Sequence, residues 1–441
     1  MGVAPDGPRS PFGLREIVRF RRDPLGFVSD NARRYGDLVS FRLGRGAAYQ
    51  VNHPDLVREL LVTHGVDHAR GPVMQRARTL MGTGLLTADD PLHAEQRRKL
   101  QPLFHRDRIA EYAQTIDAAA RAAADDWRDD EPIDVRAAML QLSLDIVGRS
   151  LFGTNLKNDG RRIAEAVNTS LPMLMDAVFL PWSDRLLRLP LPPMRRFRGA
   201  MADLDDVIDR IVREAEGANG ADTCGIAGWL LQTGSGAAWR RQVRDECVTF
   251  LLAGHETVAN ALTFALLLVA THAAAADRIA AEAEGARACP PADRFERLSY
   301  TRAVLAESMR LYPPVWILAR TLKTASTIGG HPVAPGDVIF VSQWVVQRDA
   351  RFFADPLRFV PERFLESTVP KHAYFPFGAG SRQCIGEGFA WMEGTLALAE
   401  FVGRWRLSLV SEATPRLTAS VTLRPAAPVR IRVTTRRAAP R

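Results

Sequence analysis

The chain has 441 residues, 46% of them hydrophobic and 24% charged, which is the composition of an ordinary soluble globular protein. No Gly/Ser tract, repeat or low-complexity segment divides it, so we expect one large unit over residues 1–441 and not the roughly three domains that length alone suggests. The net charge of +8 comes without a motif for binding DNA or RNA, which favours an acidic protein as the charged partner and argues against nucleic acid.

The N-terminal segment carries no targeting signal. Residues 1–20 contain Pro5, Pro8 and Pro11 and lack the apolar core of a signal peptide. The most apolar run, residues 261–270, is too short to span a bilayer. The 4 cysteines have no paired spacing, which is typical of a reducing compartment. We therefore expect a cytoplasmic protein without a membrane anchor.

The first part of the chain combines helices with short strands. Apolar residues at helical spacing predict a helix over residues 23–35, and alternation predicts a strand over residues 38–43 that can pair with residues 49–51. Another helix is expected over residues 53–62. Residues 64–90 show no clear period, and a loop of this length inside a compact protein is usually functional.

Basic side chains follow this loop. His93 and Arg97 are four residues apart in a helical segment, so they share one face of the helix, whereas Arg98 and Lys99 lie elsewhere around it. From the spacing alone, a solvated basic face explains His93 and Arg97 as well as a functional role does.

Longer helical patterns occupy the middle of the chain. We expect scaffold helices over residues 107–127 and 133–152, and further helices over residues 164–180 and 195–214 with a proline-rich break between them.

Residues 239–271 form the longest helical pattern, roughly 50 Å at 1.5 Å per residue. Its middle, residues 253–257, reads Ala-Gly-His-Glu-Thr inside an otherwise apolar segment. A glycine in a helix interior costs about 1 kcal/mol relative to alanine. A glycine beside charged and hydroxyl-bearing residues inside an apolar helix often marks a functional site. The alternative interpretation is a helical turn that faces solvent.

The C-terminal third alternates helices with short strands. Glu307 and Arg310 lie on one face of a helix expected over residues 298–311, and as an exposed pair they would contribute under about 1 kcal/mol. Arg320 follows a strand expected over residues 315–318. Further short strands are expected over residues 338–341, 405–410, 420–423 and 429–433. The predicted fold is thus mainly α with small β-sheets (α+β).

One cysteine lies in a glycine-rich stretch, residues 377–386, that reads Phe-Gly-Ala-Gly-Ser-Arg-Gln-Cys-Ile-Gly. Cys384 has no second Cys or His close by, so it is a poor zinc ligand. It suits an iron that already has four porphyrin nitrogens, where a thiolate favours O–O cleavage. Gly378 and Gly386 allow backbone to approach a flat macrocycle, and Arg382 can reach a propionate carboxylate. The helical run after Gly386 would help to keep the cysteine ionised.

The pattern of residues 377–386, F-G-x-G-x-R-x-C-x-G, resembles the haem-binding signature of the cytochrome P450 superfamily. The resemblance extends to A-G-x-[ED]-T at residues 253–257, to E-x-x-R at Glu307 and Arg310, and to P-E-R-F at residues 361–364. It implies a single cytochrome P450 domain, with haem b between the long central helix and the helix that follows the cysteine.

The resemblance also implies roles around the haem. Cys384 would be the metal ligand, Glu307 and Arg310 would lock with Arg363 as a structural brace, and residues 64–90 would cover the substrate. Other haem contacts would come from His93, Arg97, Arg320 and Arg382 at the propionates and from Phe377, Gly378 and Gly386 at the macrocycle. The residues implied for the substrate pocket are Val315, Trp316, Ile317 and Leu318.

The implied activity is monooxygenation of a lipophilic small molecule. Within the motif that starts at Ala253, Thr257 would steady dioxygen by hydrogen bonding, Glu256 would feed protons, and Gly254 would let the helix open. No dinucleotide-binding site is found, because the G-x-G pieces lack the third glycine and the strand context. Electrons are therefore expected from a separate acidic ferredoxin or flavodoxin with its NAD(P)H-dependent reductase, acting on a monomeric enzyme.

Two alternatives to this function stay open. A peroxide-using or redox-neutral haem-thiolate enzyme would need the cysteine, but such relatives commonly lack the acid–alcohol pair. A non-catalytic haem-binding sensor would need neither Glu256 nor Thr257. For the substrate, residues 189–192 and the position of Trp316 before Arg320 look like members that oxidise terpenes or fatty acids, which is an analogy only.

Overall fold

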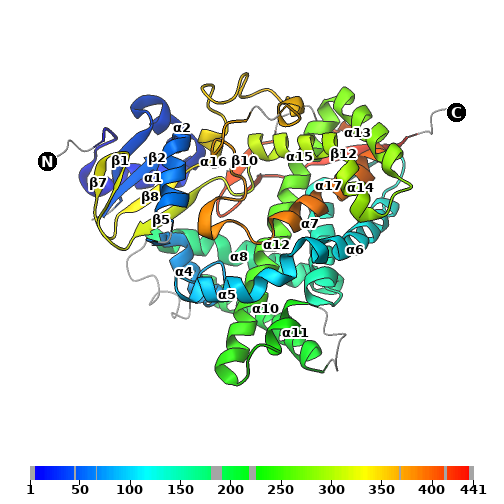
Figure 1. Ribbon diagram of the computed structural model, residues 1–441, viewed down its shortest axis with the longest axis horizontal. Coiled ribbons are helices and arrows are strands. Elements are labelled where there is room, and N and C mark those ends of the chain that lie inside the picture. Colours follow the sequence, from blue (N-terminus) through cyan, green and yellow to red (C-terminus); the bar gives the residue numbers. More distant parts are fainter. Residues whose placement is uncertain are drawn as a thin grey trace.

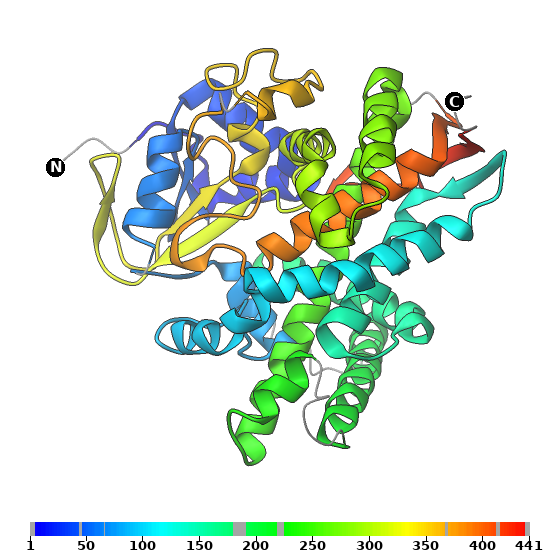
Figure 2. The same cartoon turned by 45° about the vertical axis from the view of Figure 1, so that its right-hand side comes forward.

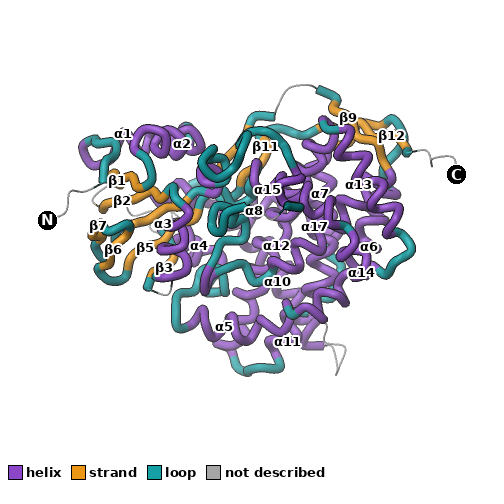
Figure 3. Tube along the Cα trace, turned by 45° about the horizontal axis from the view of Figure 1, so that its top comes forward, coloured by secondary structure: helices purple, strands orange, loops and turns teal. Residues whose placement is uncertain are grey.

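The computed structural model describes residues 5–43, 46–65, 67–179, 191–217, 225–366, 369–411 and 415–436. Its strands gather mainly in two places, one group formed from residues 38–70 and 318–341 and one near the C-terminus, and helices occupy most of the remaining volume (Figure 3). This confirms the mainly α fold with small β-sheets. Residues 180–190 lie outside the described residues, and with them residues 189–190 of the stretch 189–192 that was used for the substrate analogy.

The longer helices lie side by side around the middle of the molecule (Figure 1). The α-helices of the described part are α1 (Leu14–Arg22), α2 (Pro24–Tyr35), α3 (Pro54–Arg58), α4 (Pro72–Met81), α5 (Leu92–Leu100), α6 (Arg106–Asp125), α7 (Val135–Val147), α8 (Gly160–Phe179), α10 (Pro192–Gly217), α11 (Ile226–Leu231), α12 (Ala237–Thr271), α13 (Ala273–Ala286), α14 (Pro291–Arg297), α15 (Ser299–Leu311), α16 (Gln343–Val346) and α17 (Glu387–Arg404).

The strands of the described part are short. They are β1 (Leu38–Leu43), β2 (Gly46–Val51), β3 (His68–Arg70), β4 (Glu131–Asp134), β5 (Leu318–Leu322), β6 (Ser326–Ile328), β7 (His331–Val333), β8 (Val338–Val341), β9 (Trp405–Leu409), β10 (Leu417–Ala419), β11 (Leu423–Pro425) and β12 (Arg430–Thr435).

The largest sheet has 5 strands in the order β1-β2-β8-β5-β3. β2 pairs with β8 in parallel, and the other neighbours are antiparallel. This sheet joins strands that are far apart in sequence, so that Arg70 of β3 lies opposite Arg320 of β5. Two basic side chains that no local pattern relates are thereby brought together.

Capping residues explain where several helices begin. Asp23 precedes α2 and accepts a hydrogen bond from the Gly26 amide at 2.9 Å, while Pro24 occupies the first turn, where its missing N–H costs nothing. Pro192 opens α10 in the same way, so the prolines expected to break the chain also start the next helix.

α4 begins at Pro72 inside residues 64–90, which are therefore partly helical and not one long loop.

A second correction concerns the start of α7. Residues 133–152 were expected to be one helix, but Ile133 belongs to β4, which pairs with β12 near the C-terminus. The helix starts one residue after Asp134, whose carboxylate accepts from the Arg136 amide at 3.1 Å. The pairing with β12 supplies partners for backbone that a helix would otherwise satisfy, and no local pattern reveals it.

α12 runs through the centre of the molecule and contacts α7, α15 and α17; Figure 2 shows α17, in orange, passing beside it. Its C-terminal half is almost wholly buried, with Leu262, Phe264 and Leu266 at 0% exposure. Within the described residues α12 is the one helix long and apolar enough to cross a bilayer, but 78% of its most apolar window is buried inside the protein. Its hydrophobicity is thus accounted for by the core that it organises.

Candidate active site

The middle of α12 borders an internal cavity. The helix is continuous through residues 253–257, and Ala253, Glu256 and Thr257 line the cavity. The Thr257 hydroxyl donates to the Ala253 carbonyl at 2.6 Å, which leaves its oxygen lone pairs free to accept a hydrogen bond from the cavity side. An acid and an alcohol therefore lie next to each other at the wall of a mostly apolar space.

Gly254 has a packing role in this structure. A Cβ atom at this position would lie 3.2 Å from Cγ2 of Val147, so glycine permits the close approach of α7 to α12. The opening of the helix expected at Gly254 is not present, because α12 keeps its helical hydrogen bonding there.

Glu256 is held by two arginines that sequence reasoning missed. Its side chain is buried, and Oε1 lies 3.4 Å from Nη2 of Arg136 on α7 and 3.4 Å from Nη1 of Arg424 on β11. Burying a carboxyl group costs free energy unless it has hydrogen-bonding or charged partners, and the two arginines supply them. No sequence signal could have found them, because 120 and 168 residues separate them from Glu256.

The cavity has a volume of about 300 Å³. Aromatic and aliphatic side chains of α1, α2, α4, α8, α10, α12, β1, β5 and the segment before β5 form most of its wall, which suits a lipophilic molecule. Val315, Ile317 and Leu318 are among the lining residues. Trp316 is not, although it was expected with them.

Trp316 instead supports the wall from behind. It is fully buried, its ring stacks on that of Phe20 with centroids 6.1 Å apart, and its indole N–H donates to the Ser420 carbonyl at 2.8 Å. Trp316 thus acts on the wall through Phe20 and Ser420, which both line the cavity.

The Cys384 loop is fixed by backbone contacts. The Cys384 amide donates to the Phe377 carbonyl at 2.9 Å, and Nη1 of Arg97 donates to the Gln383 carbonyl at 2.7 Å. Arg97 thus lies with the cysteine loop in this structure. Gly380 adopts φ +74, and a Cβ atom there would lie 1.9 Å from the Leu61 carbonyl oxygen, so only glycine fits.

Two other glycines of the loop are less strictly required than Gly380. Gly378 adopts φ +73, which also favours glycine. Gly386 directly precedes α17, and its amide hydrogen-bonds the Cys384 sulfur, which opposes the rise of the thiol pKa. Phe377 is half-buried with its ring 5.6 Å from that of Trp391, which anchors the loop to α17.

Cys384 combines a deep position with an accessible sulfur. Desolvation raises the pKa of its thiol to about 11, which indicates a site surrounded by protein. The side chain nevertheless has exposed surface, so it faces an open space within the fold. No group of three or more His, Cys, Asp or Glu side chains among the described residues could hold a bare metal ion. Cys384 therefore fits a metal that brings its other ligands with it.

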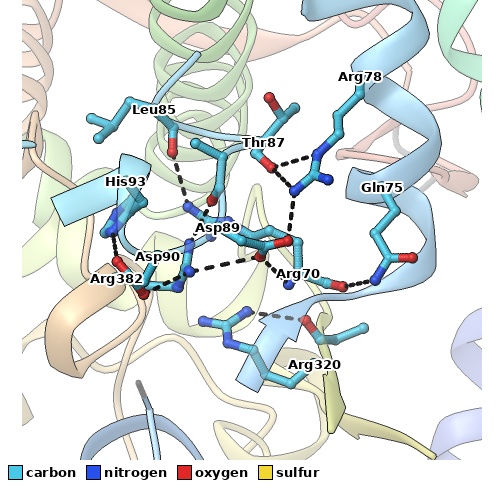
Figure 4. A network of polar contacts seen from close by, with 12 residues as sticks. Arg70, Gln75, Arg78, Leu85, Thr87, Asp89, Asp90, His93, Arg320 and Arg382 are labelled. Carbon is cyan, nitrogen blue, oxygen red and sulfur yellow. Dashed lines mark hydrogen bonds and ion pairs between the residues drawn. The ribbon is translucent and has the colours of Figure 1, made fainter. Parts of the chain in front are cut away.

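A buried basic cluster, defined by Arg70, Arg320 and Arg382, lies between β3, β5 and the cysteine loop (Figure 4). Burial and the other two arginines lower the pKa of Arg70, and burial together with Arg382 lowers that of Arg320 to about 10. His93 lies beside the cluster, and burial, Arg382 and Arg70 lower its pKa to about 4. Sequence reasoning found Arg320, Arg382 and His93 but missed Arg70, because only the pairing of β3 with β5 places it there.

Two carboxylates compensate part of this charge. Asp90 accepts from Arg382 at 2.9 Å and lies 3.2 Å from Nδ1 of His93. Asp89 is shared between two arginines: Oδ1 lies 3.7 Å from Nη2 of Arg382, and Oδ2 accepts from Arg78 at 2.6 Å. The Nε atoms of all three cluster arginines have no hydrogen-bond partner.

The cluster is therefore short of negative charge and of acceptors. Unpaired buried cations are costly, so this place fits an anionic ligand with several oxygens. The two propionates of a haem meet that description, and together with the open space at Cys384 the residues present fit such a group.

The predicted brace is assembled in full. Glu307 and Arg310 are both 0% exposed, with Nε of Arg310 at 2.7 Å from Oε2 of Glu307. Nε of Arg363 lies 3.2 Å from the other oxygen, and the Val360 amide donates to it at 2.9 Å. The remaining donors of Arg310 reach backbone carbonyls.

Comparison with known proteins decides the family. The family described as Cytochrome P450 matches residues 5–432 of this chain. The chain belongs to the cytochrome P450 family. A cytochrome P450 is a haem-thiolate protein, and the named relatives below make this one an oxidoreductase that incorporates oxygen.

Several relatives of this P450 come from Streptomyces. The chain is 36% identical over 439 residues to "Cyclooctatin synthase" of Streptomyces melanosporofaciens, covering 96% of this chain and 94% of the relative. It is 36% identical to "Cyclooctat-9-en-7-ol 5-monooxygenase" of the same organism, covering 91% and 89% of the two chains. It is 32% identical to "Pentalenene oxygenase" of Streptomyces avermitilis, covering 94% of each.

The fold has a solved counterpart. The crystal structure of CYP175A1 from Thermus thermophillus superposes with a TM-score of 0.79 at 29% identity, covering 97% of this P450 and 100% of that chain. The P450 fold predicted from the cysteine pattern is thus confirmed.

Removing one charge from the basic cluster should stabilise the haem-free P450 but weaken its hold on haem. In Arg320→Gln, the haem-free protein should unfold at a higher temperature, because one buried and poorly compensated cation is gone. Haem retention should weaken about 10- to 100-fold, since a charge-assisted hydrogen bond contributes roughly 1.5–3 kcal/mol. Differential scanning fluorimetry and haem transfer to apomyoglobin measure the two effects, with the exposed Arg358→Gln as control. Unchanged haem retention would contradict the role given to the cluster.

Proposed function

We propose that this P450 hydroxylates a lipophilic, terpene-like molecule, with Cys384 as the thiolate ligand of haem b. The observation that carries the proposal is the mostly apolar cavity that Glu256 and Thr257 help to line. Support for the substrate class comes from the relatives, whose names refer to cyclooctatin, cyclooctat-9-en-7-ol and pentalenene. A fatty acid is the second candidate, since the cavity wall is equally suited to an alkyl chain.

The bound haem would supply the iron at which dioxygen is activated by electrons from outside. Cys384 would hold it on one side, and Arg70, Arg320, Arg382 and His93 would hold its propionates. The hydrogen bond from the Gly386 amide would stabilise the thiolate form of the Cys384 sulfur.

The proton path is assigned to side chains of α12. Oγ1 of Thr257 lies at the cavity wall and would accept or relay a proton there. The carboxyl group of Glu256 would take up a proton and pass it on to Thr257, and Arg136 and Arg424 would hold the Glu256 side chain in position. The apolar wall excludes bulk water, so protons would enter by this route.

Electrons would come from a separate acidic ferredoxin or flavodoxin and its NAD(P)H-dependent reductase. Support comes from the basic residues beside the cysteine loop: Arg97 contacts that loop, and Arg98 is exposed on the same helix. Charge complementarity of this kind speeds association and weakens with salt. A cytoplasmic, monomeric enzyme is part of the same proposal.

Turnover assays separate this function from its alternatives. We expect the haem-loaded protein with NADPH, ferredoxin and ferredoxin reductase to hydroxylate members of a panel of cyclic terpenes. Product with hydrogen peroxide and none with the reductase system would favour a peroxide-using enzyme. Binding without any product under both conditions would favour a sensor.

A further inference from the structure

The turn between β10 and β11 contributes an unsatisfied hydroxyl to the cavity. Ser420, Val421 and Thr422 line the cavity from this turn. Thr422 is only 5% exposed, and its Oγ1 has no hydrogen-bond partner. A buried hydroxyl without a partner costs free energy, so it calls for an explanation.

Four other polar side chains at the cavity, those of Gln50, Ser170, Thr257 and Glu256, differ from Thr422 because they have partners. Gln50 donates to the Val28 carbonyl at 2.7 Å, and Ser170 donates to the Ala166 carbonyl. Thr257 is bound to the Ala253 carbonyl, and Glu256 is paired with two arginines. These four groups thus have hydrogen-bond or charged partners within the protein, whereas the Thr422 hydroxyl has none.

The turn that carries Thr422 is held in place from several sides. The Ser420 carbonyl accepts from the Trp316 indole at 2.8 Å, and the Leu423 amide donates to the Pro314 carbonyl at 2.9 Å. Within the turn, the Ser420 amide donates to the Thr422 carbonyl at 3.1 Å. The backbone that carries the hydroxyl is therefore held in place, which favours selective recognition.

The β10–β11 hairpin also contacts the proposed proton path. Arg424, two residues after Thr422, contacts both Glu256 on α12 and Asn168 on α8. A molecule bound at Thr422 would thus be placed relative to the acid and alcohol of α12 by one short structural element.

We propose that Thr422 Oγ1 anchors an oxygen substituent of the substrate. The substrate class is then a lipophilic molecule that already carries a hydroxyl or carbonyl group, and not a pure hydrocarbon. This rests on the proposed function and narrows it: the substrate must come from an earlier oxidation or hydration of a hydrocarbon skeleton. A site that hydrogen-bonds one substrate oxygen discriminates against analogues that lack it.

Paired ligands test the anchor. The haem-loaded wild type, Thr422→Val and Thr395→Val are compared by equilibrium dialysis against α-cedrene with cedrol and against dodecane with 1-dodecanol. Thr395 is a matched control, because its hydroxyl is also buried and unpartnered but does not line the cavity.

In the wild type and in Thr395→Val, we expect at least one alcohol to bind about 3- to 10-fold more tightly than its hydrocarbon. In Thr422→Val this preference should vanish, while the affinity for the hydrocarbon stays the same. An alcohol preference that is absent in the wild type, or unchanged in Thr422→Val, would overturn the anchor and leave the proposed function standing. If no probe binds the wild type, the proposed substrate class fails and the anchor with it.

A stability readout excludes a structural role for the hydroxyl. Thr422→Val should unfold at the same temperature as the wild type or higher, because the substitution breaks no hydrogen bond and removes an unsatisfied polar group. A lower unfolding temperature would show that the hydroxyl supports the turn and would contradict the inference.

Discussion

Replacing Glu307 by glutamine should lower the free energy of unfolding by about 3–5 kcal/mol, the usual cost of removing one partner of a buried ion pair. Arg310 is fully buried and its two donors to Glu307 lie at 2.7 and 2.9 Å. The substitution leaves this guanidinium without a counter-charge in a place that water does not reach. Urea unfolding, followed by tryptophan fluorescence, measures the loss.

A surface pair nearby provides the control. Glu362 also pairs with an arginine, Arg278 at 3.2 Å, but the side chains are 45% and 51% exposed. Such pairs contribute under about 1 kcal/mol, so Glu362→Gln should be close to neutral. A Glu307→Gln variant as stable as Glu362→Gln would show that the brace is dispensable for stability.

The second large effect is expected on catalysis. In Thr257→Ala, most electrons from NADPH should end in peroxide or water and not in product, and the rate of product formation should fall by about 10²- to 10⁴-fold, which is typical for loss of a proton-transfer group. The reason is the position of Oγ1 at the cavity wall beside Glu256. Parallel assays of NADPH consumption, peroxide and product give the coupling ratio.

Thr263 allows a closely matched control on the same helix. Its hydroxyl donates to the Ala259 carbonyl at 2.7 Å, as that of Thr257 does to Ala253 at 2.6 Å, but Thr263 does not line the cavity. Thr263→Ala should therefore keep normal coupling. Equal loss of coupling in both variants would mean that the hydroxyls act through the helix, and the proton-delivery role of Thr257 would be wrong.

The sequence was informative where function depends on local patterns. The cysteine loop, the acid–alcohol segment and the Glu307–Arg310 pair are each short runs, and their residues meet because they are neighbours on one element. The long central helix was predicted over residues 239–271 and is observed at Ala237–Thr271, because the segment is long, largely apolar and free of proline.

The sequence was uninformative where distant segments meet. Arg70 joins the basic cluster only because β3 pairs with β5, and Arg136 and Arg424 reach Glu256 from a helix and a strand that fold against α12 from far along the chain. The partnerless hydroxyl of Thr422 is equally invisible in sequence, since being unsatisfied is a property of the folded surroundings. These contacts depend on tertiary packing, which local periodicity does not encode.

The central claim is that Cys384 ligates a haem as a thiolate, and the absorption spectrum of the dithionite-reduced protein with carbon monoxide tests it most directly. We expect a strongly red-shifted Soret band in the wild type and its loss in Cys384→Ser, whereas Cys289→Ser, at a half-buried cysteine elsewhere, should leave the band unchanged. A band typical of histidine-ligated haem, or no haem in well-folded wild-type protein, would contradict the claim.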